Sequence, residues 1–249
     1  MEKVSIFGVN YTVCDYESAA KEIVENAQKR NSYGVSALAV HGLIECFRNP
    51  DLMKLINALN LTVPDGQPTR WAMNFFHKTE LKDRVSGPQL TLVVLKKAND
   101  LGLGIYLYGS KQETLDKFGL FINKNYPEIK IAGTHADRFR DATPEEDIKD
   151  IEKINASGAH LILVGRGCPR QEKWVSNHLG KIDGAMMAVG AAFDFCAGTL
   201  RKAPTWMQRN GLEWLFRLYV EPRRLWRRYL VTNSLFIYLF IKQSLKLKV

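Results

Sequence analysis

One aspartate stands in a sequence context that suits acid–base chemistry. Asp65 lies in the turn Val63-Pro64-Asp65-Gly66, which follows a short apolar run and precedes a helical pattern over 67–76. A carboxylate at the end of a strand can accept a proton from a hydroxyl group. Pro-Asp-Gly is also an ordinary turn signal. The motif therefore supports two interpretations, a general base and a structural turn.

Three glycine-containing turns follow apolar runs farther along the chain. They are Gly109-Ser110, Gly165-Arg166-Gly167-Cys168-Pro169 and Gly190-Ala191-Ala192-Phe193-Asp194. Glycine lets the backbone approach a phosphate closely, and a helix N-terminus that follows favours its negative charge. Each turn alone is a common strand-to-helix connection, but three at one sheet edge indicate a nucleotide-type ligand.

Two side chains beside these turns are candidates for contacting that ligand. Gln171 lies in the helix that begins near Pro169, and a buried amide needs hydrogen-bond partners, which a ligand can supply. Asp194 could accept hydrogen bonds from ribose hydroxyls or a base edge, or it could cap the next helix. The segment Gly165-x-Gly167-x-x-Arg170 lacks the third glycine of the dinucleotide-binding fingerprint, which disfavours an NAD enzyme. The chain also has no P-loop motif, which disfavours a P-loop kinase.

Arginines, rather than metal ligands, are the groups available to neutralise a diphosphate. The chain has no Asp-x-Asp and no His-Glu-x-x-His motif, so we expect no metal and no other cofactor. Arg84 precedes a helix, where it could bind phosphate or simply lie at the surface. The spacing of Arg217, Arg224 and Arg228 predicts that they share one helix face. Such a face could stabilise a departing diphosphate or bind anionic lipid.

Apolar strands alternate with helical patterns through most of the chain. The predicted strands are Ser36–Val40, Gly104–Tyr108, Lys130–Gly133, His160–Val164 and Ala185–Val189, and the predicted helices are Gly87–Leu101, Gln112–Asn125, Thr143–Ser157 and Pro169–Leu179. Strands without polar alternation, separated by helices, are typical of a parallel sheet that is covered on both faces. We therefore predict an α/β, Rossmann-like layered fold.

The C-terminal segment differs from the rest in charge and in aromatic content. Residues 201–249 hold eleven Lys and Arg and two acids, so they carry the whole net charge of +9. The stretch Tyr229–Ile241 is apolar and aromatic but shorter than the ~20 residues of a membrane-spanning helix. We predict a catalytic α/β domain over 1–200 and a helical, membrane-associating appendage over 201–249; a buried core or dimer helix is the alternative for the apolar stretch.

Cysteine use and the N-terminus predict a cytosolic environment. The four cysteines form no Cys-x-x-Cys pair, which argues against structural zinc and a disulfide scaffold. The first residues contain no apolar run long enough for a signal peptide. Together with the basic tail, these features predict a peripheral protein at the cytoplasmic face of the bacterial inner membrane, bound to an anionic surface.

Several motifs, in their order and spacing, resemble the WecG/TagA/CpsF glycosyltransferases (family twenty-six). In the second half they are Gly167-x-Pro169-x-Gln171-Glu172-x-Trp174, Phe193-Asp194-x-x-Ala197-Gly198, Lys202-Ala203-Pro204 and the run from Gly211 to Tyr229 that includes Glu221-Pro222-Arg223-Arg224. Upstream they are Pro64-Asp65-Gly66, Arg84-Val85-x-Gly87 and Leu107-x-Gly109. The resemblance covers roughly residues 30–230.

This resemblance implies an inverting, metal-independent transfer of a hexose-type sugar. The implied donor is a UDP-sugar, the implied acceptor is a saccharide on undecaprenyl diphosphate, and the expected product belongs to exopolysaccharide, capsule, teichoic acid or common antigen. It assigns Asp65 as the base, and it assigns the glycine turns, Gln171 and Asp194 to the nucleotide. The tail arginines Arg217, Arg224, Arg227 and Arg228 then help to complete the active site.

The chain departs from the family pattern near the first predicted strand. The family usually has Thr-x-Asn there, whereas this chain has Ala37 and Ala39, followed by Val40-His41-Gly42. Either His41 replaces the polar pair or the sugar specificity differs; an isolated histidine after a strand is also often structural. Lys202 stands where the family commonly has arginine and keeps the positive charge.

A non-catalytic α/β protein that binds nucleotides or nucleic acid is the alternative function. A nucleic-acid binder typically spreads basic charge over a face with exposed aromatics. Here the charge is confined to the tail, and we expect no nucleic-acid partner. The transferred sugar, the resulting polysaccharide and the oligomeric state are not determined by the sequence.

Overall fold

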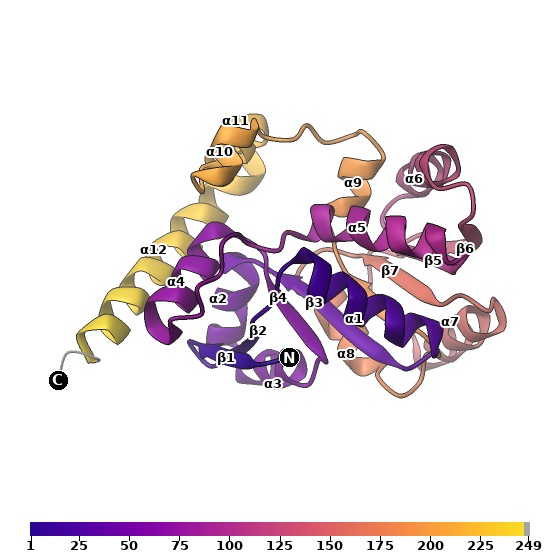
Figure 1. Ribbon diagram of the computed structural model, residues 1–249, viewed down its shortest axis with the longest axis horizontal. Coiled ribbons are helices and arrows are strands. Elements are labelled where there is room, and N and C mark those ends of the chain that lie inside the picture. Colours follow the sequence, from indigo (N-terminus) through magenta and orange to yellow (C-terminus); the bar gives the residue numbers. More distant parts are fainter. Residues whose placement is uncertain (247–249) are drawn as a thin grey trace.

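A six-stranded parallel sheet forms the centre of the computed structural model, which describes residues 1–246 (Figure 1). The strand order is β4-β3-β8-β7-β5-β6, and every neighbouring pair is parallel. The strands are β3 (Tyr33–Leu38), β4 (Leu61–Pro64), β5 (Gly104–Gly109), β6 (Lys130–His135), β7 (Leu161–Gly165) and β8 (Ala185–Ala188). The carboxyl ends of all six strands therefore lie at one edge.

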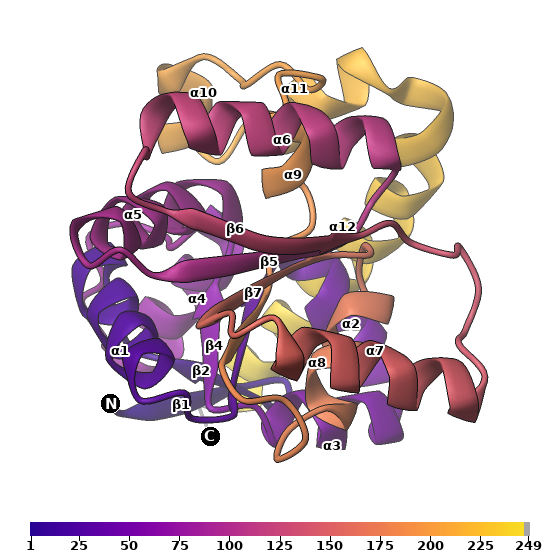
Figure 2. The ribbon, with the colours of Figure 1, turned by 90° about the vertical axis from the view of Figure 1, so that its right-hand side faces the viewer.

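Helices cover both faces of this sheet. One face packs against α1 (Tyr16–Gln28), α5 (Gly87–Asp100), α6 (Gln112–Asn125) and α9 (Ala192–Cys196). The other face packs against α7 (Pro144–Ala156) and α8 (Arg170–Asn177). Figure 2 shows α6 and α9 above the sheet and α7 and α8 below it.

Side-chain direction along β7 explains why these strands lack polar alternation. Leu161 and Leu163 belong to the core on one face, whereas Ile162 and Val164 belong to the core on the other. Successive side chains of a strand point to opposite faces, so a strand covered on both sides has no solvent-facing position. The predicted α/β fold with a doubly covered parallel sheet is confirmed.

A third core joins the N-terminal hairpin to the C-terminal helix. The hairpin consists of β1 (Lys3–Ile6) and β2 (Val9–Thr12), and it packs with α2 (Val40–Arg48), α3 (Pro50–Asn57), α4 (Gln67–His77) and α12 (Pro222–Lys246). The short helices α10 (Thr205–Arg209) and α11 (Glu213–Val220) precede α12. Figure 1 shows α12 running alongside α2 and α4.

The hairpin tip anchors α12 through an aromatic contact. Phe7 and Gly8 form a two-residue turn in which both residues have positive φ, as the twist of a tight hairpin requires. The Phe7 ring packs edge-on against Phe236 of α12 at a centroid distance of 5.6 Å and against Phe76 of α4 at 6.4 Å. The first and last elements of the chain are thereby packed together.

The structure corrects some predicted boundaries and adds elements that the sequence reading missed. The α6 helix spans the predicted residues, and α7 begins at the predicted cap, where Thr143 and Glu146 form a capping box. The strand predicted over Ser36–Val40 is wrong at its end, because β3 stops at Leu38 and Val40 opens α2. The hairpin and α1–α3 lie outside the predicted elements; for the hairpin, strands of four residues carry too weak a periodic signal.

We predict that Phe236→Ala lowers the free energy of unfolding by about 3 kcal/mol, because a buried phenylalanine is replaced by a cavity. Phe236 is 7% exposed, whereas Tyr238 on the same helix is 57% exposed. Tyr238→Ala, the matched control, should have little effect. Urea denaturation measures both, and equal losses would contradict the proposed anchoring of α12.

Candidate active site

A cavity of about 790 Å³ lies at the carboxyl edge of the sheet. Its walls come from the residues that follow β3, β4, β5, β7 and β8, and from α11 and α12. In open parallel sheets, ligands bind beyond the carboxyl ends of the strands. The cavity therefore occupies the place where this fold class positions a ligand.

Most of the predicted site residues line this one cavity. They are His41, Asp65, Arg84, Ser110, Gly165, Gly167, Gln171, Asp194, Arg217, Arg224 and Arg228. Gly109 lies behind the wall, where its Cα packs so closely on Gly165 that an added Cβ would come within 2.7 Å of the Gly165 carbonyl oxygen. Arg227 is exposed on α12 and is not among the residues that line the cavity.

Asp65 follows β4 directly and is held by the start of α5. Its Oδ2 accepts a hydrogen bond from the Gly87 backbone N–H at 3.3 Å. An added Cβ at Gly87 would lie only 3.2 Å from the Ala37 Cβ, so glycine allows α5 to begin this close to β3. Burial raises the pKa of Asp65 to about 6, against the opposing effect of Arg84 and with a further increase from Glu213. A carboxyl with this pKa is ionised near neutral pH and is well matched to accept a proton.

Arg84 connects the Asp65 region to the C-terminal segment. Its Nη2 donates to Glu213 Oε2 at the start of α11, and only 11% of the Arg84 side chain is exposed. The sequence allows Arg84 to be either a phosphate ligand or a surface residue. The side chain is largely buried and ion-paired, so the surface alternative is wrong, and its charge acts on Asp65.

Two arginines in the cavity wall have buried nitrogens without a partner. Arg217 Nε and Arg228 Nε form no hydrogen bond within residues 1–246, and neither guanidinium takes part in a salt bridge there. Buried donors are nearly always paired in folded proteins. The pair is therefore suited to an anionic ligand in the cavity.

The prediction that Arg217, Arg224 and Arg228 share one helix face is wrong. Arg217 lies on α11, whereas Arg224 and Arg228 lie on α12, and the chain bends at Glu221 between the two helices. The three residues do not share one helix face. All three nevertheless line the same cavity, because the chain changes direction at this bend.

On the opposite wall, Gln171 and Asp194 flank the turns that follow β7 and β8. Gln171 Oε1 accepts a hydrogen bond from the Gly167 N–H at 3.1 Å. Asp194 lies inside α9, whose N-cap is Ala191, and the N-cap of the next helix, α10, is Pro204, so the capping alternative is wrong. Thr199 Oγ1 donates to Asp194 Oδ1 at 3.3 Å.

His41 lies in the first turn of α2 and not in a loop after β3. Burial lowers the pKa of His41, and the nearby Arg228 lowers it further. Its Nδ1 is 3.9 Å from Glu45 Oε1 and makes no hydrogen bond within the described part of the chain. Ala37 and Ala39, at the positions aligned with the Thr-x-Asn pair, also line the cavity and contribute no polar side chain to it.

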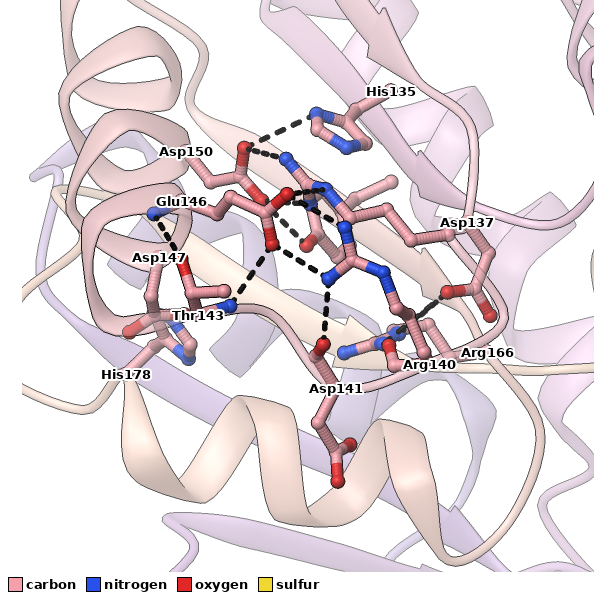
Figure 3. A network of polar contacts seen from close by, with 12 residues as sticks. His135, Asp137, Arg140, Asp141, Thr143, Glu146, Asp147, Asp150, Arg166 and His178 are labelled. Carbon is pink, nitrogen blue, oxygen red and sulfur yellow. Dashed lines mark hydrogen bonds and ion pairs between the residues drawn. The ribbon is translucent and has the colours of Figure 1, made fainter.

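An ion-pair network that the sequence reading missed supports the cavity from outside (Figure 3). Asp150 accepts two hydrogen bonds from Arg138, at 2.6 and 2.9 Å, and one from the Tyr108 hydroxyl at 2.9 Å. Asp137 pairs with Arg166 and Arg170, and its backbone N–H donates to the Ser110 carbonyl. The network thus fixes the turns after β5 and β7. The signal for this network in the sequence is the close mixture of acidic and basic residues over 137–150.

Neither a metal site nor a membrane-spanning helix is found in the part of the chain that the structure describes. Within residues 1–246, no three His, Cys, Asp or Glu side chains are grouped so that they could hold a metal ion. Among the same residues, no helix is both long and apolar enough to cross a bilayer.

Comparison with known proteins agrees with this arrangement. The family described as "Glycosyl transferase WecG/TagA/CpsF family" matches residues 4–249. A relative in Bacillus subtilis (strain 168), an N-acetylglucosaminyldiphosphoundecaprenol N-acetyl-beta-D-mannosaminyltransferase, is 29% identical over 184 residues, which are 74% of this chain and 69% of the relative. The family match spans the hairpin, the sheet and α12, and so includes every wall of the cavity. The chain therefore belongs to the WecG/TagA/CpsF family of glycosyltransferases.

Proposed function

We propose that the protein transfers a hexose-type sugar from a UDP-sugar to a saccharide carried on undecaprenyl diphosphate. The observation that carries this proposal is a partly buried carboxyl with a raised pKa, Asp65, in the same cavity as the unpaired Arg217 and Arg228. The Bacillus subtilis relative is named for N-acetylmannosamine transfer to N-acetylglucosaminyl diphosphoundecaprenol. We extend this class of acceptor, and a role in cell-envelope polysaccharide synthesis, to the present chain.

In this mechanism Asp65 acts as the general base. Its carboxylate removes the proton from the acceptor hydroxyl while that oxygen attacks the anomeric carbon of the donor. The bond from the anomeric carbon to the diphosphate breaks, and UDP leaves with the bonding electrons. A single displacement from the opposite face inverts the anomeric configuration, as in other one-step transfers at a sugar carbon.

The arginines supply the charge that the leaving diphosphate needs. Arg217 and Arg228 have unpaired buried nitrogens, and Arg224 lies between them along the chain. Guanidinium groups placed where negative charge develops stabilise the transition state. We therefore propose that transfer requires no metal ion. Asp194 and Gln171 are the proposed contacts to the nucleoside end.

The cavity-facing side of α12 matches an acceptor that has a charged head and an apolar chain. At intervals of four residues it presents first basic, then polar, then aromatic side chains: Arg224, Arg228, Thr232, Phe236 and Phe240. At the rise of an α-helix this series covers about 24 Å. A diphosphate at the basic end and the first isoprenoid units at the aromatic end would use both parts of the face.

The outer side of the appendage supports association with a membrane surface. Basic residues of the appendage accompany large apolar side chains there. The exposed apolar side chains are Trp206, Tyr219, Trp226, Leu230, Tyr238, Ile241 and Leu245. Apolar and basic groups on one helical surface favour the interface of an anionic bilayer. We propose a peripheral position at the cytoplasmic face of the membrane, with residues 201–249 as the appendage and 1–200 as the catalytic domain.

We predict that Asp65→Asn lowers kcat at least a hundredfold, because the amide cannot accept the hydroxyl proton. UDP affinity should stay within about threefold of wild type, since Asp65 contacts the acceptor side. Turnover is measured with a panel of UDP-sugars, and UDP affinity is measured by titration calorimetry. Wild-type turnover by the variant would rule out Asp65 as the base.

The pH dependence of transfer provides a second test of Asp65. Because the base must be ionised and its pKa is raised to about 6, kcat/KM should be constant above that pH and fall as pH decreases through it. Glu213 raises this pKa, so Glu213→Gln should move the acidic limb to lower pH. An unchanged limb in Glu213→Gln would show that another group sets it.

For the membrane surface, we expect the double variant Tyr238→Ser/Ile241→Ser to bind vesicles that contain anionic lipid at least fivefold more weakly. Both side chains are more than half exposed, so the fold should be unaffected. Co-sedimentation measures binding, and Leu120→Ser on α6, an exposed leucine far from the appendage in sequence, is the control. Equal binding by all three proteins would contradict the proposed surface.

A further inference from the structure

A second acid borders the cavity, and the proposed mechanism does not use it. Glu172 lies in the first turn of α8, is 1% exposed and lines the cavity beside Gln171. Its Oε1 accepts hydrogen bonds from Gln171 Nε2 at 2.9 Å and from Ser36 Oγ of β3 at 3.4 Å. Its Oε2 has no hydrogen-bond partner within residues 1–246.

Through Gln171, this carboxyl is coupled to two of the three glycine turns. Gln171 Oε1 accepts from the Gly167 N–H after β7. The same oxygen would lie 3.0 Å from a Cβ added at Gly190 after β8, so the amide packs directly on that turn. Glu172 completes the connection to β3 through Ser36. We refer to these contacts of Gln171 and Glu172 as the Gln171–Glu172 clamp.

The clamp determines which way the Gln171 amide faces. The Gly167 N–H requires an acceptor, so the amide oxygen must point to it and the amide nitrogen must point to Glu172. Glu172 Oε1 is the only acceptor for that nitrogen within the described residues. Without an acceptor at position 172, the amide is free to rotate, and the two turns lose their shared partner.

The surroundings of Glu172 favour the uncharged acid. The carboxyl contacts an amide and a hydroxyl, and the nearby titratable groups are the thiols of Cys168 and Cys46, with Glu45 beyond them. No salt bridge to Glu172 occurs within residues 1–246. A buried carboxylate without a cation is costly, and burial raises the pKa of Glu172.

We propose that Glu172 is a positioning residue: an uncharged carboxylic acid that orients Gln171 and so holds the turns after β7 and β8 in the shape that receives the donor nucleotide. The role in donor binding rests on the proposed function. Glu172 transfers no proton. Its carbonyl oxygen acts as the fixed acceptor of the clamp, and its proton resides on Oε2.

Two substitutions of similar size separate this role from a charged or catalytic one. Glu172→Gln keeps an acceptor oxygen and adds no charge, so donor KM and UDP affinity should stay within about threefold of wild type. Glu172→Leu removes the acceptor, and donor KM and the UDP Kd should rise about tenfold, while kcat changes less. Ile182→Ala, buried in the same core but before β8 at the end of the sheet opposite the cavity, should lower stability without raising donor KM.

An infrared measurement tests the protonation state independently of turnover. Near neutral pH, the carbonyl stretch of a buried neutral carboxylic acid should be present in the wild type and in Asp65→Asn, and absent in Glu172→Gln. Absence of the band in the wild type would overturn the proposal. So would a Glu172→Gln variant as inactive as Asp65→Asn, or a Glu172→Leu variant with wild-type UDP affinity.

The same set of variants distinguishes failure of the clamp from failure of the proposed function. If the wild-type chain does not bind UDP, the proposed function fails. The infrared band and the difference in Tm between Glu172→Gln and Glu172→Leu would still test the clamp. A lower Tm for the leucine variant supports it, and equal values contradict it.

Discussion

The parallel arrangement of the six strands is the constraint on which the site depends. Because neighbouring strands run in the same direction, their carboxyl ends meet at one edge, and every turn that leaves that edge faces the same space. Asp65 follows β4, Gly165 ends β7 and Gly190 follows β8, so residues more than a hundred positions apart border one cavity. An antiparallel pairing would send alternate turns to opposite edges and separate the base from the nucleotide turns.

The sheet alone leaves one side of this space open, and the C-terminal helices close it. The closing contacts are of two kinds. The aromatic rings of Phe7 and Phe236 pack α12 against the hairpin, and the Arg84–Glu213 ion pair ties α11 to the residues beside Asp65. Apolar packing contributes most of the stability, whereas the buried ion pair specifies the position of charges around the base. The segment with the whole net charge of the protein thereby forms a wall of the cavity as well as an outer surface.

Two acids of the cavity illustrate how environment divides roles between like groups. Asp65 is partly buried near Arg84, and its pKa rises only to about 6, so the carboxyl can be ionised and can take up a proton. Glu172 is buried against amide, hydroxyl and thiol groups without a salt bridge in the described part of the chain, which favours the neutral form. The same side-chain chemistry therefore suits a base in one place and a fixed hydrogen-bond acceptor in the other.

The sequence by itself determined the features that depend on neighbouring residues. Apolar strands between helical patterns were enough to predict the layered α/β fold, the Thr143–Glu146 cap marked the start of α7, and the glycine turns and Asp65 lay at strand ends as predicted. Tertiary structure decided the rest: the bend at Glu221 that places Arg217 and Arg224 on the walls of one cavity, the pairing of Arg84 with Glu213, and the hairpin that anchors α12. These features depend on contacts between residues that lie far apart in the chain. Local spacing records only the preferences of a segment, whereas burial and charge at a site are set by whatever segment packs against it.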